Sequence, residues 1–242
     1  MEIINPSGSK RCEIAAEYLA SVPCDGCRYN RVIILPIPSF RDGVHISGTD
    51  CTQDTLLPYL DKSTLLCGYA LSPVAGLAEE RGCAVLDLSE SEEFLFKNTE
   101  LTSHAALSKI LSLTGRDVCD LKIGVIGYGR LGASLVRHLL FLGASPTVFS
   151  GSSEKRSSLL LLGVTALDYK EICQTELDLL INTAPERLFS SPSPAEPFFD
   201  LASGEHYKTE GAISLPSLPE KFYPQSSGKL YAKLIFDYVS LH

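Results

Sequence analysis

Short apolar runs alternate along the chain with segments in which apolar residues recur every three or four positions. The runs predict strands and the periodic segments predict helices, because side chains repeat every second residue in a strand and about every 3.6 residues in a helix. Apolar strands separated by helices indicate a mostly parallel sheet that is covered on both faces. The predicted strands are residues 2–4, 31–37, 65–69, 83–87, 121–126, 146–149, 177–182, 197–201 and 211–214.

These elements predict an α/β fold made of two Rossmann-like parallel-sheet domains with a cleft between them. Residues 1–97 predict an N-terminal α/β domain. Residues 98–116 predict a linking helix, and residues 117–223 predict a Rossmann-type domain that binds NAD(P). Residues 224–242 predict a C-terminal helix, which we expect to pack back on the first domain.

The turn after the strand at residues 121–126 carries three glycines, Gly127, Gly129 and Gly132, in the spacing G-x-G-x-x-G. It leads into a predicted amphipathic helix over residues 130–142. The first glycine allows a tight turn, the second lets backbone approach a pyrophosphate, and the third lets the helix lie close to the sheet. Such turns also occur in α/β proteins without a nucleotide, but a preceding strand and a following amphipathic helix favour dinucleotide binding.

The residues after the next strand predict which nucleotide binds. In this fold an Asp or Glu about 20 residues beyond the glycines binds the ribose 2′-hydroxyl of NAD. Here the strand is followed by Ser150, Ser152, Ser153 and Lys155. Hydroxyl groups and a cation accommodate a 2′-phosphate, which a carboxylate would repel, so the sequence favours NADP, with NAD as the alternative. A second interpretation is that Ser152 or Ser153 only caps the following helix.

Composition narrows the class of partner. The chain has 242 residues, 45% of them hydrophobic, and a formal net charge of −8. Nucleic-acid binding depends on basic patches, so this acidic balance argues against it. The sequence contains no apolar run of the ~20 residues that a membrane span requires, and its start does not have the pattern of a signal peptide. We therefore expect a cytoplasmic protein.

The eight cysteines are scattered along the chain, unlike those of a small disulfide-stabilised protein. Cys24 and Cys27 form a C-x-x-C pair, but no second pair or histidine cluster completes a zinc-binding pattern. The sequence therefore predicts reduced thiols and no metal site.

Several short motifs occur in an order that is similar to one known family. They are Leu35-Pro36-Ile37-Pro38-Ser39 after a strand, Asn98-Thr99-Glu100-Leu101-Thr102 at the linking helix, Gly127-Tyr128-Gly129-Arg130-Leu131-Gly132, Asn182-Thr183-Ala184-Pro185, Asp200-Leu201-Ala202-Ser203, and Ser217-Leu218-Pro219 before the last helix. Together they resemble the A chain of bacterial dipicolinate synthase.

This resemblance implies an NADP-dependent oxidoreductase that acts during sporulation and oxidises a dihydrodipicolinate-like small dicarboxylate. It also implies a small flavoprotein-like polypeptide as partner, and we expect a homo-oligomer. The implied cofactor contacts are the glycine turn with Arg130 and Leu131, and then Asn182, Thr183, Ala184, Pro185, Ala202 and Ser203. The residues implied to face a substrate carboxylate are Ser39, Asn98 and Thr102.

Compared with the family, the flavodoxin-like first domain is shortened, because residues 22–30 lead directly from a helix to the strand at Val32, without a further strand and helix. The chain also departs from the family pattern at His104, where the family has an acidic residue. His104 either replaces that carboxylate as a general base or marks lost activity, and a lone histidine near a helix start is also commonly a cap or surface residue. The alternative function is therefore a catalytically impaired NAD(P)-binding paralogue with a regulatory or assembly role. Retention of the Asn182–Pro185 turn favours the enzyme, because phosphate binding alone needs only the glycines.

Overall fold

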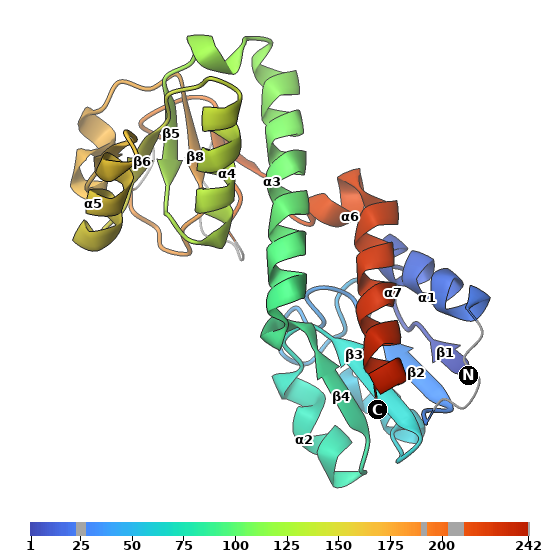
Figure 1. The fold of residues 1–242 in the computed structure, drawn as a ribbon. Helices are drawn as coiled ribbons and strands as arrows, with labels where there is room; N and C mark the ends of the chain where they lie inside the picture. Colours follow the sequence, from blue (N-terminus) through green and yellow to red (C-terminus); the bar gives the residue numbers. More distant parts are fainter. Residues whose placement is uncertain (23–27, 190–192, 203–210, 242) are drawn as a thin grey trace. The chain divides into compact units, whose positions relative to one another are not determined.

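The computed structural model describes residues 1–22, 28–189, 193–202 and 211–241, so the Cys24/Cys27 pair and Ser203 lie outside the described residues. The chain forms two compact units, Met1–Asn98 with Pro219–His242 and Thr99–Leu218. Each unit contains one parallel sheet with helices (Figure 1), which confirms the predicted α/β class with two Rossmann-like sheets.

The first unit has a four-stranded sheet in the order β1-β2-β3-β4, and every neighbouring pair is parallel. A flavodoxin-like sheet has the order 2-1-3-4-5, and removal of its second strand leaves strands in sequential order. The observed order is therefore the one expected for a shortened sheet of this type. The strands are β1 (Glu2–Ile4), β2 (Arg31–Ile34), β3 (Thr64–Gly68) and β4 (Ala84–Asp87).

The helices of this unit are α1 (Lys10–Ser21), α2 (Ser72–Glu80) and α7 (Pro224–Leu241), with α6 (Leu218–Phe222) at its boundary and the short turns η1 (Gln53–Tyr59) and η2 (Leu88–Glu90). The C-terminal helix α7 packs against α1, as predicted. A Cβ atom at Gly228 would lie 2.6 Å from Cγ2 of Ile14, so the absence of a side chain sets how closely these helices approach. Tyr231, fully buried, donates its hydroxyl to the Leu35 carbonyl oxygen at 3.0 Å and so ties α7 to the end of β2.

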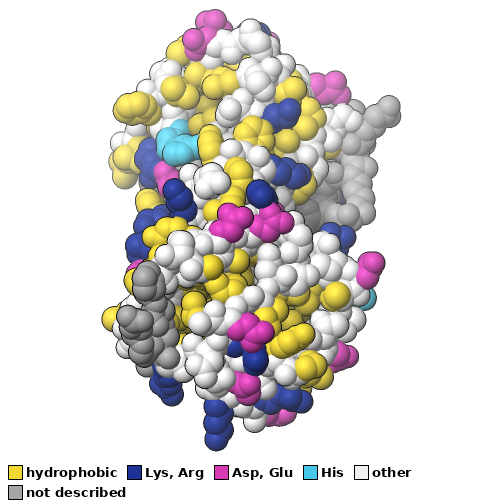
Figure 2. Space-filling model, turned by 90° about the vertical axis from the view of Figure 1, so that its right-hand side faces the viewer, with side chains coloured by type: hydrophobic (Ala, Val, Ile, Leu, Met, Phe, Trp, Pro, Cys, Tyr) yellow, Lys and Arg dark blue, Asp and Glu magenta, His cyan; other side chains and the backbone are white. Residues whose placement is uncertain are grey.

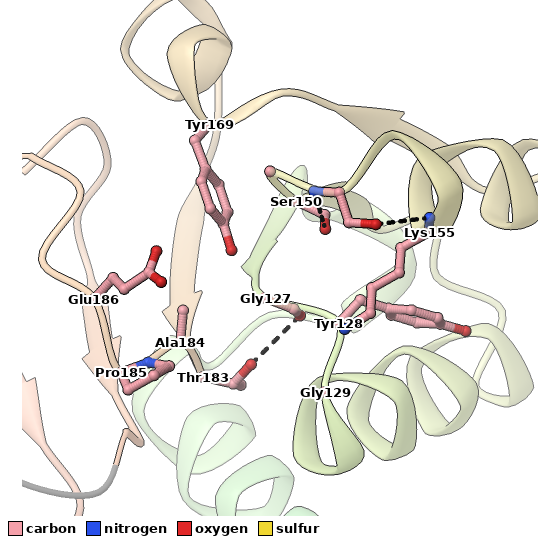
Figure 3. Close-up of a pocket in the computed structure, with 12 residues that line it drawn as sticks. Gly127, Tyr128, Gly129, Ser150, Lys155, Tyr169, Thr183, Ala184, Pro185 and Glu186 are labelled. Carbon is pink, nitrogen blue, oxygen red and sulfur yellow. Dashed lines mark hydrogen bonds between the residues drawn. The ribbon is translucent and has the colours of Figure 1, made fainter.

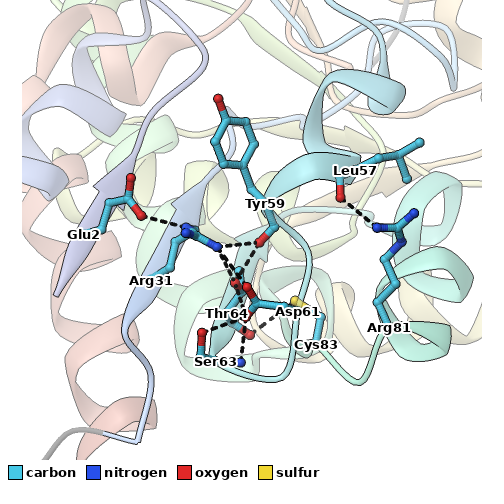
Figure 4. Close-up of polar contacts among 9 residues, drawn as sticks. All are labelled: Glu2, Arg31, Leu57, Tyr59, Asp61, Ser63, Thr64, Arg81 and Cys83. Atoms are coloured by element: carbon cyan, nitrogen blue, oxygen red, sulfur yellow. Dashed lines mark hydrogen bonds and ion pairs between the residues drawn. The ribbon is translucent and has the colours of Figure 1, made fainter.

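The start of β2 is held by Arg31, whose guanidinium group contacts three neighbouring segments (Figure 4). Its Nε donates to Glu2 Oε2 at 2.7 Å, and its Nη1 lies 3.1 Å from both Asp61 Oδ2 and the Tyr59 carbonyl oxygen. One side chain thus connects β1, β2 and the segment before β3.

The second unit has a six-stranded parallel sheet in the order β10-β9-β8-β5-β6-β7. Counted from β5, this is the 3-2-1-4-5-6 order of dinucleotide-binding folds. The strands are β5 (Ile123–Ile126), β6 (Thr147–Phe149), β7 (Thr165–Leu167), β8 (Leu179–Asn182), β9 (Phe198–Asp200) and β10 (Ala212–Ser214). The helical segments are η3 (Val118–Asp120), α4 (Arg130–Phe141), α5 (Ser153–Leu161) and η4 (Tyr169–Gln174).

The linking helix α3 (Glu92–Thr114) begins six residues before the predicted range of 98–116. The Ser91 hydroxyl accepts a hydrogen bond from the Phe94 backbone N–H at 3.2 Å, which is the geometry of an N-cap. Glu92 and Glu93 follow in the first turn, where carboxylates interact favourably with the helix dipole. The start predicted at residue 98 was wrong, because the helix is capped at Ser91 and its first turn is polar.

Charged side chains of both signs are mixed with hydrophobic ones on the face of the molecule that Figure 2 shows. No extended basic area stands out among the described residues on that face. Among the residues that the structure describes, every helix is too short or too polar to span a bilayer.

Packing at Gly228 leads to a stability prediction. Gly228→Ala places a methyl group against Ile14 and should lower the free energy of unfolding by about 1–3 kcal/mol. Gly76→Ala is the matched control, because Gly76 also lies within a helix but has open space around its Cα, so it should raise that free energy by about 0.5–1 kcal/mol. Urea denaturation followed by circular dichroism measures both; equal effects of the two substitutions would contradict this account of the α1–α7 contact.

Candidate functional site

The three glycines after β5 have three different structural roles. Gly127 has a φ of +90°, a conformation that residues with a side chain rarely adopt. Gly132 lies one turn into α4, where an added Cβ would overlap the Gly127 carbonyl oxygen. Gly129 is the N-cap of α4, and an added Cβ there would meet no atom within 4 Å. The first and third glycines therefore bring helix and strand together, and the second leaves space above the helix N-terminus.

The turn after β8 supports the glycine turn from the other side. The Thr183 hydroxyl donates to the Ile126 carbonyl oxygen at 2.8 Å, at the point where β5 ends. Asn182 is fully buried; its Nδ2 donates to Asp200 Oδ1 at 2.8 Å, and its Oδ1 accepts from the Ala184 N–H at 3.1 Å. Asn182 thus shapes the turn from inside, while Thr183 reaches the surface of the pocket.

A pocket of about 380 Å³ lies between these two turns (Figure 3). It is at the carboxyl ends of β5, β6 and β8, and β5 and β8 are the neighbours at which the strand order reverses. Ligands of open α/β sheets bind at such a switch point. The pocket is lined by Gly127, Tyr128, Gly129, Ser150, Gly151, Ser152, Lys155, Tyr169, Thr183, Ala184, Pro185 and Glu186.

Hydroxyl groups and one cation line the pocket beyond the end of β6. Ser152 is the N-cap of α5, and its hydroxyl accepts from the Lys155 N–H at 3.2 Å, so the predicted capping role and the pocket position coexist. Ser150 is buried, and its hydroxyl accepts from the Ser152 N–H at 3.3 Å. The neighbouring Arg156 forms an ion pair with Asp168 at 2.9 Å, so Lys155 is the cation that lines the pocket.

The pocket lining also contains two side chains that the sequence analysis missed, Tyr169 and Glu186. Both point into the pocket in Figure 3. Burial raises the pKa of the Tyr169 hydroxyl, and Glu186 and Asp168 add to this effect, so the phenol stays protonated at neutral pH. Tyr169 follows β7, an element absent from the predicted strands, so no sequence signal pointed to it. Glu186 directly follows the predicted turn and could have been included with it.

Some predicted cofactor residues lie outside the pocket lining: Arg130, Leu131, Gly132, Ser153, Asn182 and Ala202. Gly132 and Asn182 act on the pocket indirectly, through helix packing and through the turn after β8.

The four residues predicted to act on substrate differ in burial and in hydrogen bonding. Ser39 is fully buried; its hydroxyl donates to the Pro36 carbonyl oxygen at 3.0 Å and accepts from the Tyr69 N–H at 2.7 Å, which is a structural role in the first unit. Asn98 and Thr102 are half-buried and one turn apart in α3. His104 is exposed on α3, with its Nε2 3.3 Å from Nε2 of His138. A role of these four residues in catalysis stays a prediction.

Comparison with known proteins gives consistent results in sequence and in fold. No protein-family model matches the chain. The A chain of dipicolinate synthase from Bacillus subtilis is 23% identical over an alignment of 224 residues, and the match covers 84% of this chain and 75% of that protein. Its solved structure has a TM-score of 0.72 at 18% identity, covering 99% of this chain and 96% of the other.

Two further solved structures share the fold. The A chain of dipicolinate synthase from Bacillus halodurans has a TM-score of 0.76 at 17% identity, with 98% of this chain and 97% of that chain covered. A transhydrogenase from Sinorhizobium meliloti has a TM-score of 0.59 at 14% identity, with 87% and 74% covered.

The strand order and the glycine turn define a Rossmann-type unit in a chain that has the fold of NAD(P)-dependent oxidoreductases. Within that class, the predicted resemblance is confirmed: over most of its length the chain is similar, in sequence and in fold, to the A chain of dipicolinate synthase.

Proposed function

We propose that this protein is an NADP-dependent oxidoreductase that resembles the A chain of dipicolinate synthase and oxidises a dihydrodipicolinate-like small dicarboxylate. The observation that carries the proposal is the open space at Gly129, in a turn whose two other glycines are closely packed. If the turn served packing alone, a side chain at residue 129 would be tolerated, because an added Cβ there would meet no atom within 4 Å.

The residues present fit a dinucleotide. The backbone N–H groups at the start of α4 have no acceptor in the preceding turn of the helix, so they suit a pyrophosphate placed over Gly129. The aromatic ring of Tyr169 offers a stacking surface for an adenine, and the Thr183–Pro185 turn lines the other end of the pocket. When bound, the nicotinamide supplies a two-electron acceptor that takes a hydride.

The preference for NADP rests on the end of β6. The pocket lining there is Ser150, Gly151, Ser152 and Lys155, without a carboxylate among the described residues of that turn. Asp168, the nearby acid, is already paired with Arg156. Lys155 and the two serines can therefore contact a 2′-phosphate, which a carboxylate at the strand end would repel.

The substrate class is supported by a buried cation in the first unit. Arg11 is 3% exposed, and its Nε and Nη1 atoms lack a hydrogen-bond partner in the described structure. Buried guanidinium groups are normally paired, because an unpaired charge is costly to remove from water. Arg11 is the second residue of α1, the helix that follows β1, and the nearby Glu220 carboxylate favours its charged form. A substrate carboxylate would complete the hydrogen bonds of its guanidinium group. Oxidation of a dihydropyridine dicarboxylate would remove a hydride and a proton and leave an aromatic ring, and a bound nicotinamide would supply the acceptor for the hydride.

The remaining parts of the proposal follow the resemblance. They are a cytoplasmic protein that acts in sporulation, a small flavoprotein-like polypeptide as partner, and a homo-oligomeric state. The second candidate function, an NAD(P)-binding paralogue of impaired activity, is favoured by one observation. Ser39, expected to face the substrate, has its hydroxyl engaged by two backbone groups.

The cofactor assignment makes a prediction for Lys155. In the unmodified chain, NADPH should bind with micromolar-range affinity and NADH more weakly. Lys155→Ala should reduce the affinity for NADPH on the order of tenfold, as loss of one charge-assisted contact does. Its affinity for NADH should not change. Titration by nucleotide fluorescence measures both, with the exposed Lys170→Ala as control; equal binding of the two nucleotides by the unmodified chain would refute the NADP preference.

A second prediction concerns the glycine turn. Gly129→Asp should abolish nucleotide binding because its carboxylate would meet the pyrophosphate. The fold should persist because the position is open. The unfolding midpoint by circular dichroism separates this effect from misfolding. Gly129→Asp protein that still binds NADPH normally would show that the turn holds no nucleotide.

A third prediction separates the enzyme from the paralogue. With NADP, a dihydrodipicolinate precursor and a flavoprotein-like partner, the chain should produce NADPH and the ultraviolet absorbance of a pyridine dicarboxylate. Arg11→Met should suppress this activity and leave stability unchanged or higher, since it removes a buried charge of which Nε and Nη1 lack a hydrogen-bond partner. Arg81→Met, which removes an exposed arginine that donates to the Leu57 carbonyl oxygen, is the control and should retain activity. NADPH binding without turnover under these conditions would favour the paralogue.

A further inference from the structure

Three side chains that could bind a metal ion lie together outside the pocket. Glu100 and His104 are one turn apart in α3, and His138 lies across from them in α4. His104 Nε2 is 3.3 Å from His138 Nε2, and His138 Nε2 is 3.5 Å from Glu100 Oε2. One ligand atom from each residue lies within 4.8 Å of the other two.

The other ring nitrogen of His138 also has a partner. Its Nδ1 lies 3.0 Å from the Ser103 hydroxyl. When Nδ1 carries the proton and donates it to this hydroxyl, the lone pair of His138 is on Nε2 and points toward His104 and Glu100. Metal-binding histidines are commonly oriented in this way by a second hydrogen bond.

The spacing of the two imidazole nitrogens matches a tetrahedral metal centre. Two Zn–N bonds of about 2.0–2.1 Å at the tetrahedral angle place their nitrogens about 3.3–3.4 Å apart. We propose that Glu100, His104 and His138 form a binding site for a divalent transition metal of the Zn²⁺ class, with Ser103 positioning His138. This set of two nitrogens and one oxygen suits Zn²⁺, Co²⁺ or Ni²⁺ better than Mg²⁺ or Ca²⁺.

The charge state of the cluster is compatible with a cation. Burial on its own would raise the pKa of Glu100, but hydrogen bonds from Ser134 at 2.7 Å and from Arg137 lower it below its usual value, so the carboxylate is charged. Burial lowers the pKa of His138; His104 and Arg137 lower it further, whereas Glu100 raises it, and the net lowering favours the neutral imidazole that binds metals.

Arg137 is a cation that would compete with a metal ion for the Glu100 carboxylate. Its guanidinium contacts both oxygens of Glu100, at 2.6 and 2.7 Å. Its side chain is 58% exposed, so it can turn into solvent when a metal replaces it at Oε2. With three protein ligands the site keeps an open position for water or another ligand. A bound ion would also join α3 to the helix that begins at the glycine turn.

The test uses the full chain without a histidine tag, stripped with a chelator and titrated with Co²⁺ and Zn²⁺. The unmodified protein should take up one Co²⁺ with the visible spectrum of a tetrahedral site, and without the near-ultraviolet charge-transfer band that cysteine thiolates would add. His104→Ala changes an exposed residue, so it should fold and lose the spectrum. Ser103→Ala should weaken binding about 10–100-fold, as loss of a positioning residue does. His45→Ala, an exposed histidine of the first unit, is the matched control.

Zn²⁺ should raise the melting temperature of the unmodified protein and of His45→Ala, and should leave that of His104→Ala unchanged. Three results would overturn the proposal: failure of the unmodified protein to bind either metal, a spectrum dominated by thiolate ligation, or equal binding by His104→Ala. Nucleotide titration of the same samples is a separate readout, because the proposal does not depend on NADP binding.

Discussion

The close contact between α4 and the end of β5 is the constraint on which the second unit depends. The Gly127 carbonyl oxygen occupies the space where a side chain at residue 132 would be. This contact brings the first turn of α4 against the strand, and the Thr183 hydroxyl holds the strand end from the other side. Backbone and helix meet there without intervening side chains, and the space next to Gly129, the N-cap of α4, is open. The pocket is a consequence of this packing.

The first unit meets a different requirement, because its sheet has only four strands and both faces must still be covered. The C-terminal helix α7 contributes to one face, beside α1, and its close approach requires the missing side chain at Gly228. Tyr231 satisfies its hydroxyl group on the Leu35 carbonyl, so an aromatic ring can be fully buried there without losing a hydrogen bond. Residues from the two ends of the chain thus form one core, together with the buried Arg11.

Much of the fold could be predicted because its signals are local. Apolar runs and helical periodicity located most strands and the long helices, and the G-x-G-x-x-G spacing located the turn around Gly129. The end of α4 could also be predicted, because helices commonly end at a glycine that adopts a positive φ. Gly143 has this conformation, with a φ of +87°. The sequence pattern was less informative for short elements. The three-residue strand β7 gave too few residues for a period, and the N-cap at Ser91 was overlooked, so α3 was predicted to begin too late.

By itself, then, the sequence determined the α/β class, the glycine turn and the hydroxyl-rich end of β6, because each depends on residues that are neighbours along the chain. Only the tertiary structure decided which side chains meet. Strand order brings Tyr169 and Glu186 to the same pocket as Gly129, and helix packing places His104 opposite His138. Contacts of this kind depend on the crossing of helices and the order of strands. Those arrangements follow from how the whole core packs, and no local pattern encodes them.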